Sequence, residues 1–454
     1  MTTTTHPMAD KPVGQLLRQF AVPSIIAMLV SSLYNIIDQL FIGQSIGLLG
    51  NAATNIAFPL TPTCVAFSLM FGIGGGARFY LAMGAGRKKE AAAYMGNALL
   101  MLVSCGIVLC IIVRLFLTPM LLLFGATDQV LDYARTYTGI TSLGFPFLIL
   151  ATGGGHLIRA DGSPNFSMVC NITGAVINTI LDALFIFKFD MGMAGAAWAT
   201  VISQGISGIL CLVYIVKAVP ILHLHKEDWR PSGHLLKIQL AVGIPMALQY
   251  SITAIGTMMV QTALNLLGST QVAAFTAANK IEQIVTQAYV AMGTTMATYC
   301  AQNIGAGKIK RIRQGFKSIT IMGSIYSVVV AAIIMTVGKY MTYLFLSGDL
   351  TEIMHSVDIY LKCVGTFFIP LTVVNVYRNG IQGMGYGLLP MMAGVAELVG
   401  RGVVAMIAAG QKSYFGVCMA SPAAWILASA LLIVMYYYVI RQNEKRFAKY
   451  ADEE

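Results

Sequence analysis

Long uninterrupted runs of apolar residues follow one another along almost the whole chain. A helix needs about 20 such residues to cross the hydrocarbon layer of a bilayer, which is about 30 Å thick. The runs are about twice as long as the strands of a membrane β-barrel, which have about ten residues. The sequence therefore predicts an all-α integral membrane protein with twelve transmembrane helices, over approximately residues 15–43, 53–83, 92–124, 132–158, 164–187, 193–218, 236–264, 275–303, 314–346, 353–381, 388–411 and 419–441.

The composition excludes the main alternatives to a membrane protein. Hydrophobic residues make up 57% of the chain and charged residues 11%, whereas a soluble domain has about 25% charged residues. A soluble fold could not bury so much apolar surface, and disorder requires more charge and less hydrophobicity. The eight cysteines form no CxxC pair, so neither a metal cluster nor a disulfide framework is expected.

Basic residues predict the orientation in the membrane. The net charge is +10, from 29 Lys and Arg against 19 Asp and Glu. If the N-terminus is placed in the cytoplasm, most of the basic residues fall in or beside cytoplasmic segments, as the positive-inside rule requires. We therefore expect both termini in the cytoplasm, the lipid bilayer as the main partner, and no nucleic-acid binding.

The two halves of the chain resemble each other at an offset of about 220 residues, which indicates an internal repeat. Pro23 corresponds to Pro245, and the segment GAGR at 84–87 corresponds to GAGK at 305–308. Six spans in each copy make the two copies point the same way. We expect an N-terminal lobe, a cytoplasmic linker and a C-terminal lobe at residues 1–216, 217–235 and 236–454. Two like-oriented lobes are typical of a transporter with alternating access.

Two aspartates in the apolar runs of the first half require an explanation. Asp38 shares a helix face with Tyr34 and Asn35, and Asp182 shares one with Asn178. A charged group inside a membrane costs about 2.5–3.5 kcal/mol on insertion scales, so it needs a partner or a function. The carboxylates could be buried neutral, or paired with a distant base such as Arg114. Alternatively, carboxylate, amide and hydroxyl oxygens could bind Na⁺, or the desolvated carboxylates could carry a proton.

The second half has other candidates. Glu397 and Arg401 are four residues apart and are expected to form a structural pair. Glu282 could meet a cationic substrate or pair with Lys362. A neutral polar stripe in the seventh span could line a cavity or bond to neighbouring helices; it consists of Gln249, Thr253, Thr257 and Gln261.

Sequence motifs for nucleotide binding or catalysis are absent. The segment Gly305–Lys308 lacks the first glycine and the final Ser or Thr of a phosphate-binding loop, and no HExxH or GxSxG occurs. We therefore expect no enzymatic activity and no cofactor. The energy for uphill transport would come from an ion gradient, with Na⁺ or H⁺ as the coupling ion.

Several motifs, taken in order, resemble the multidrug and toxic compound extrusion (MATE) family over roughly residues 12–441. They are VP near the start of the first span, the D-QLFIG end of that span, RADGSP after the fourth, N-x-x-x-D in the fifth, AQNIGAGK after the eighth and E-x-x-x-R in the eleventh. The resemblance implies a V-shaped central cleft between the lobes. It also implies an antiporter of the plasma (inner) membrane of a prokaryote that confers drug and antibiotic resistance by exchanging lipophilic organic cations for Na⁺ or H⁺.

The resemblance also implies positions for the coupling site. The family's cation site in the N-terminal lobe maps onto Asp38, Asn178, Asp182 and Thr200, which would hold Na⁺ or a proton. Tyr34, Asn35, the polar stripe of the seventh span and Glu282 would line the substrate cleft. We expect the protein to work as a monomer. The rival interpretations are a flippase for a lipid-linked saccharide, an exporter of a specific metabolite, and a membrane-embedded transferase.

Overall fold

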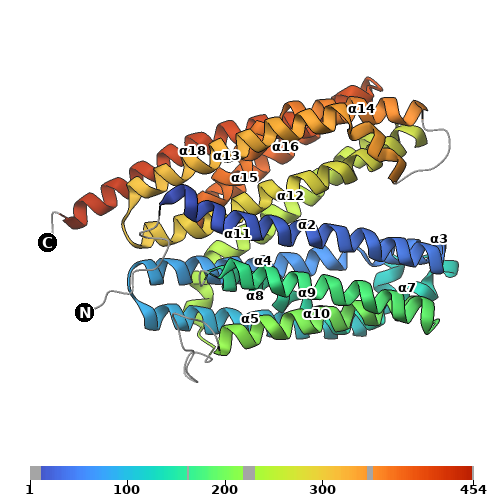
Figure 1. Cartoon of the computed structure of the whole chain (residues 1–454), viewed down its shortest axis with the longest axis horizontal. Helices are drawn as coiled ribbons and strands as arrows, with labels where there is room; N and C mark the ends of the chain where they lie inside the picture. Colours follow the sequence, from blue (N-terminus) through green and yellow to red (C-terminus); the bar gives the residue numbers. More distant parts are fainter. Residues whose placement is uncertain (1–11, 161–162, 218–230, 345–350, 452–454) are drawn as a thin grey trace. The chain divides into compact units, whose positions relative to one another are not determined.

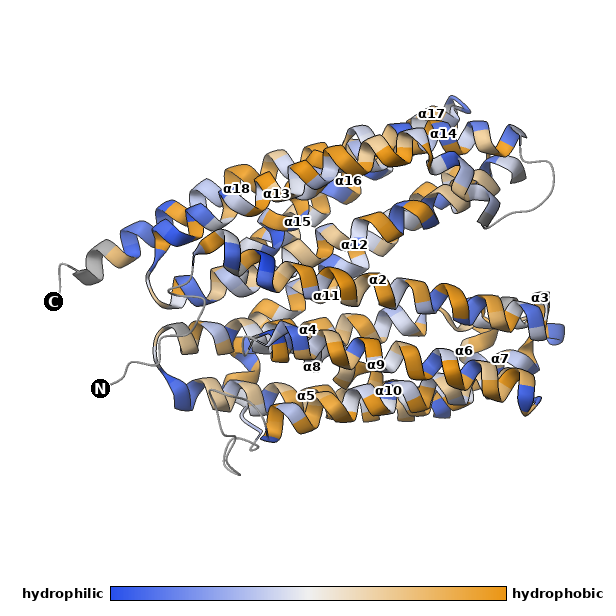
Figure 2. Ribbon diagram, in the orientation of Figure 1, coloured by the Kyte–Doolittle hydropathy of each residue, from blue (hydrophilic) through white to orange (hydrophobic). Residues whose placement is uncertain are grey.

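The computed structural model describes residues 12–160, 163–217, 231–344 and 351–451, and these residues form helices joined by short turns (Figure 1). In hydrocarbon every backbone amide must be bonded within its own segment, and a helix meets this requirement. Most of the predicted linker, residues 218–230, lies outside the described residues. Apolar residues cover the helices along their length (Figure 2).

Ten helices in the described part of the chain are long and apolar enough to cross a membrane. An eleventh span is the bent pair α14 (Thr351–Thr366) and α15 (Phe368–Gly383), whose axes differ by 51°. The predicted eighth span is α12 (Ser269–Gly305), which has 37 residues but is more polar and does not reach the same hydropathy. These helices together correspond to the twelve predicted spans.

The described helices pack as two compact units. The N-terminal unit runs from Val22 to Ala247, and the C-terminal unit combines the start of α2, as far as Ala21, with the residues from Leu248 onward. The further helices of the N-terminal unit are α3 (Leu48–Ala57), α4 (Leu60–Gly84), α5 (Lys88–Leu115), α6 (Leu117–Leu123), α7 (Asp128–Thr141), η1 (Ser142–Gly144), α8 (Phe145–Ala160), α9 (Pro164–Asp182), η2 (Ala183–Lys188) and α10 (Gly192–Lys217). Those of the C-terminal unit, besides α12, α14 and α15, are α13 (Ile309–Thr336), η4 (Gly338–Leu344), α16 (Leu388–Gly410), α17 (Tyr414–Cys418) and α18 (Ala420–Ala451).

Two helices, α2 (Val13–Ser45) and α11 (Gly233–Asn265), each contribute to both units. The division falls between Ala21 and Val22 in one helix and between Ala247 and Leu248 in the other. Each of these points lies within two residues of the proline inside its helix, Pro23 or Pro245. The compact units therefore divide within helices rather than at the predicted linker.

The internal repeat is visible in the helices. Helices α2 and α11 have 33 residues each, α5 and α13 have 28 each, and α8 and α15 have 16 each. The turns after α4 and α12 also match: Gly86 has a φ of 75° and Gly307 a φ of 69°. In both turns the next amide donates to a carbonyl five residues back at 2.8 Å. Glycine adopts this left-handed backbone without steric cost.

The start of α11 is packed tightly into the N-terminal unit. A Cβ added to Gly243 would lie 2.1 Å from the carbonyl oxygen of Met70 in α4, so only glycine fits there. The side chain of Gln239 accepts a hydrogen bond from Asn97 and donates one to the carbonyl of Tyr94, both at 2.7 Å. Buried amide groups need such partners, and these bonds tie α11 to α5.

Candidate functional site

The candidate site lies in the N-terminal unit, where α2 and α9 place polar side chains in the interior. Asp38 on α2 is 8% exposed, and Asn178 and Asp182 on α9 are 2% and 0% exposed. The helical spacing of the sequence predicted that Asn178 and Asp182 share a face, since they are four residues apart. Three polar side chains are thus buried in a region that is otherwise apolar.

The structure brings the two aspartates together. Their carboxyl groups lie close enough for each to act electrostatically on the other. If both carboxyl groups are ionised, each can only accept hydrogen bonds, so neither can donate a hydrogen bond to the other. In that state one oxygen of Asp38, both oxygens of Asp182 and both polar atoms of the Asn178 amide have no hydrogen-bond partner.

No described base neutralises this charge. Ion pairs between described residues leave out both aspartates. Arg114, considered as a distant partner, donates instead to the carbonyl of Gly139 at 2.9 Å. Unpaired buried carboxylates are costly, so the site is balanced only when a proton or a cation joins them.

The chemistry of the donors suits a hard, small cation or a proton. Carboxylate and amide oxygens are the ligands that hard cations prefer, whereas transition metals favour imidazole or thiolate. The described residues contain no group of three or more His, Cys, Asp or Glu that could hold a metal ion. The unpartnered oxygens of Asp38, Asn178 and Asp182 are donors of the kind that a hard cation or a proton takes.

Neighbouring side chains complete the surroundings of the aspartates. Tyr34 on α2 and Tyr137 on α7 both lie within electrostatic range of the two carboxylates. Asn35 is exposed and donates to the carbonyl of Ser31 in its own helix. The Thr200 hydroxyl donates to the carbonyl of Ala196 at 3.0 Å, which leaves its lone pairs available. Its role as an ion ligand stays a prediction.

Two features near Asp38 and Asp182 were not predicted from the sequence. Gln39 donates to Asp38 at 3.4 Å and accepts from Thr54 of α3 at 3.1 Å, so a short chain of bonds links the site to another helix. The π-helical turn η2 starts directly after Asp182. Such turns are frequent at functional sites, but their hydrogen-bond shift has no signature that a pattern of apolar residues would reveal.

In the C-terminal unit, Glu397 pairs with Arg401 at 2.8 Å, as the spacing of four residues predicted. It also pairs with Arg378 of α15 at 2.6 Å, a partner that sequence reasoning missed. All three side chains are largely buried, with 6–11% exposure. One carboxylate bridging two guanidinium groups joins α15 to α16, which supports a structural role for the cluster.

Glu282 is buried and accepts a hydrogen bond from the hydroxyl of Tyr360, which in turn accepts one from Asn279. The alternative that Glu282 pairs with Lys362 is wrong, because Lys362 pairs with Asp358 one turn away at 2.5 Å. Those two residues lie on the same helix face, and their pairing requires no contact between helices. Contact of Glu282 with a substrate stays a prediction.

The polar stripe of α11 has mixed partners. The Gln249 side chain accepts from Gln382 of α15 at 2.8 Å, so it bonds to a neighbouring helix. Thr253 and Thr257 donate to carbonyls one turn back in their own helix, and Gln261 donates to Asn265. The side chains of Thr257 and Gln261 are exposed, whereas that of Gln249 is half-buried.

A family model described as MatE matches residues 23–184 and 242–407, which is most of the chain. The chain belongs to the MATE family. It is therefore a multi-pass membrane transporter, and the resemblance seen in its motifs is confirmed. The matched segments include Asp38, Asn178 and Asp182 of the candidate site.

Individual MATE relatives agree with this assignment. The chain is 30% identical over 382 residues to "Probable multidrug resistance protein YpnP" of Bacillus subtilis, covering 82% of this chain and 83% of that protein. It is 24% identical to "Multidrug export protein MepA" of Staphylococcus haemolyticus, over 84% and 82% of the two chains. It is 26% identical to "FAD transporter" of Shewanella oneidensis, over 68% and 69%.

Solved structures show the same fold. A crystal structure of MATE in complex with MaL6 has a TM-score of 0.91 at 20% identity, covering 98% of this chain and 100% of that chain. An outward-facing multidrug resistance MATE transporter of the MOP superfamily also has a TM-score of 0.91 at 20% identity, covering 98% and 99%. The all-helical fold predicted from the sequence is that of MATE transporters.

Proposed function

We propose that this MATE transporter is a multidrug efflux antiporter that exports lipophilic organic cations in exchange for Na⁺ or H⁺. The observation that carries the proposal is the buried pair of Asp38 and Asp182, which has no base beside it among the described residues. Relatives named multidrug resistance and multidrug export proteins support the class of cargo.

The exchange follows from the electrostatics of the pair. With no ion bound, the two carboxylates repel each other and three of their four oxygens lack hydrogen-bond donors, so the empty site is unstable in an apolar interior. A proton or Na⁺ removes the repulsion and supplies the missing partner. Binding of the ion therefore favours a different packing of α2 and α9 from that of the empty site. A conformational change of this kind couples the ion to the cargo only if the two states bind the ion with different affinity.

The test is efflux of a fluorescent organic cation from proteoliposomes under an imposed Na⁺ or pH gradient. Asp38→Asn and Asp182→Asn should each abolish gradient-driven efflux, while Asp132→Asn, an exposed aspartate on α7, should keep it. The gradient that drives the wild type identifies the ion. Full efflux by both site variants would remove the proposed coupling site.

A second cargo class has one specific support: a relative is named as an FAD transporter. A flavin nucleotide is an anion, and it would need unpaired basic groups in its path. The buried arginines of the C-terminal unit, Arg378 and Arg401, share the carboxylate of Glu397. The acidic pair of the N-terminal unit has no basic partner among the described residues, so we favour cationic cargo. Transport of a flavin nucleotide, with no transport of organic cations, would reverse this preference.

The surroundings of the transporter are part of the proposal. We place it in the inner membrane of a prokaryote with both termini in the cytoplasm, because the basic residues gather in the segments that would then be cytoplasmic. Accessibility of cysteines introduced near residues 12 and 446 to a membrane-impermeant reagent in whole cells tests this orientation. Labelling of either position in intact cells would contradict it.

A further inference from the structure

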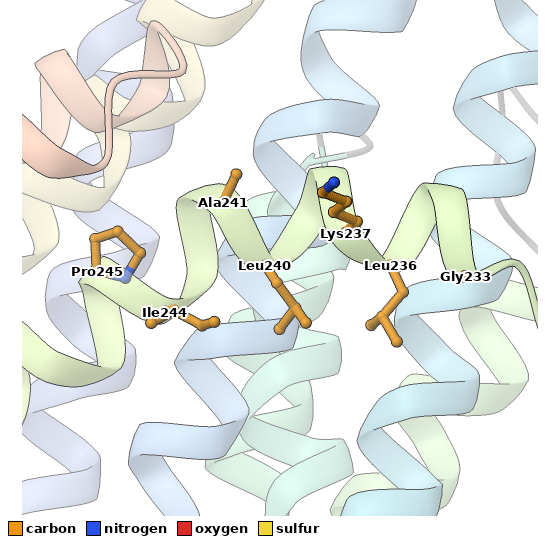
Figure 3. Close-up of a pocket in the computed structure, with 7 residues that line it drawn as sticks. All are labelled: Gly233, Leu236, Lys237, Leu240, Ala241, Ile244 and Pro245. Carbon is orange, nitrogen blue, oxygen red and sulfur yellow. The ribbon is translucent and has the colours of Figure 1, made fainter.

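The first half of α11 carries a groove of about 570 Å³ along one side (Figure 3). The groove extends from Gly233 to Pro245, and its lining includes Leu236, Leu240 and Ile244. Lys237, near the beginning of α11, is the one charged residue among the described residues that line it. All lining residues belong to the N-terminal unit. One charged end and an apolar length are the features that an amphiphile with an anionic head would match.

The groove lies between two rows of side chains on one helix. Leu236, Leu240 and Ile244 form one row, and Lys237 and Ala241 belong to the other, with neighbours in each row four positions apart (Figure 3). Rows at this spacing are the natural ridges of a helix surface.

The opposite face of the same helix is fixed in the protein interior. Gln239, Val242 and Gly243 are buried there, and Gln239 is bonded to α5 as described above. The groove therefore lies on the side of α11 that is not packed into the N-terminal unit, on a helix that cannot easily rotate.

The length of the groove fits one leaflet of a membrane. Twelve residues of helix rise about 18 Å, close to half of a hydrocarbon layer of about 30 Å. The positive-inside rule puts the basic beginning of α11 at the cytoplasmic surface. Anionic lipids give that surface its negative potential, and each basic residue near it contributes about 1 kcal/mol of attraction.

We propose that this groove binds an anionic phospholipid of the cytoplasmic leaflet. The ammonium group of Lys237, which has no ion-pair partner within the part of the chain that the structure describes, binds the phosphate. An acyl chain lies along Leu236, Leu240 and Ile244, the last of which is 45% exposed. A transported organic cation fits this groove poorly, because Lys237 would repel it. The site is independent of the proposed exchange and of its cargo.

The test is a lipid titration of the purified full-length protein, read by native mass spectrometry. Phosphatidylglycerol and phosphatidylcholine with the same acyl chains are compared. The wild type should retain phosphatidylglycerol more strongly, and Lys237→Gln should weaken that binding about fivefold, the equivalent of about 1 kcal/mol. Lys217→Gln removes another exposed charge, at the end of α10, and should have no such effect.

A second variant tests the apolar part of the groove. Ile244→Trp fills the groove without changing charge, and it replaces an exposed side chain, so it should fold and still lose phosphatidylglycerol. Unchanged binding in either Lys237→Gln or Ile244→Trp overturns the site. Equal losses in Lys237→Gln and Lys217→Gln also overturn it, because they indicate attraction to general surface charge. Displacement of the lipid by an organic cation would assign the groove to cargo instead.

Discussion

The substitution Asp182→Asn tests the charge pair separately from transport. For reference, two unit charges about 4 Å apart repel by about 4 kcal/mol at an effective dielectric constant near 20. Asp182 is fully buried and both of its oxygens lack donors, so this repulsion acts on the folded protein when the ion is absent. An asparagine removes one charge, and its amide can donate to the unpartnered oxygen of Asp38.

The variant should therefore transport less but unfold at a higher temperature when no ion is bound. A hydrogen bond to a charged group contributes about 1.5–3 kcal/mol, which sets a lower limit of about 1.5 kcal/mol for the stabilisation. For a unit of this size that corresponds to at least about 3 °C in the unfolding temperature. The repulsion of about 4 kcal/mol sets the upper limit.

The assay is thermal unfolding of the purified protein in alkaline buffer without sodium, followed by addition of Na⁺ or a decrease in pH. The wild type should gain stability with the coupling ion, because binding to the native state stabilises it, whereas the variant should respond much less. Asp132→Asn, the exposed control, should behave as the wild type. An unchanged or lower unfolding temperature in the variant, together with the full response of the wild type to the ion, would refute a repelling pair.

Three further substitutions test the packing of helices within each unit. Glu397→Gln leaves two buried guanidinium groups without their neutralising carboxylate and should lower the free energy of unfolding by about 3–5 kcal/mol. Glu444→Gln, in an exposed ion pair, should change it by less than about 1 kcal/mol in the same unfolding assay. Gly243→Ala should destabilise the protein strongly, because its Cβ would clash with a backbone carbonyl of α4. The control Gly233→Ala places its Cβ in open space and should not change the stability. The yield of monodisperse protein measures both effects. Tyr360→Phe removes the donor to a buried glutamate and should lower the unfolding temperature, and an unchanged value would show that water replaces the hydroxyl.

Hydropathy alone predicted the helices, because a bilayer requires long apolar segments whose backbone bonds are internal. The breaks within them depend on packing instead. The second predicted span contains the join between α3 and α4 at Phe58 and Pro59, and the tenth bends by 51° at Phe367, before Pro370. Proline marks these places in the sequence, but it does not give the angle.

Part of the candidate site could likewise be predicted from the sequence, and part depended on packing. Helical periodicity predicted that Asn178 and Asp182 share a face, and Asp38 was notable because a charge is rare in an apolar run. The contact between Asp38 and Asp182 was expected only from the family resemblance. Long-range partners, such as Arg378 for Glu397 and Tyr360 for Glu282, were missed, because nothing within one helix specifies which side chain a neighbouring helix presents.

The beginning of α11 has a consequence for how the chain is made. Asn97 is fully buried, and its partner Gln239 lies beyond all six predicted spans of the first half. When the ribosome has released those six spans, the N-terminal unit still lacks the first half of α11, which packs against its interior. Maturation of the first half must therefore wait until translation has passed Ala247, and a truncated product that ends before α11 should be recognised by membrane quality-control proteases.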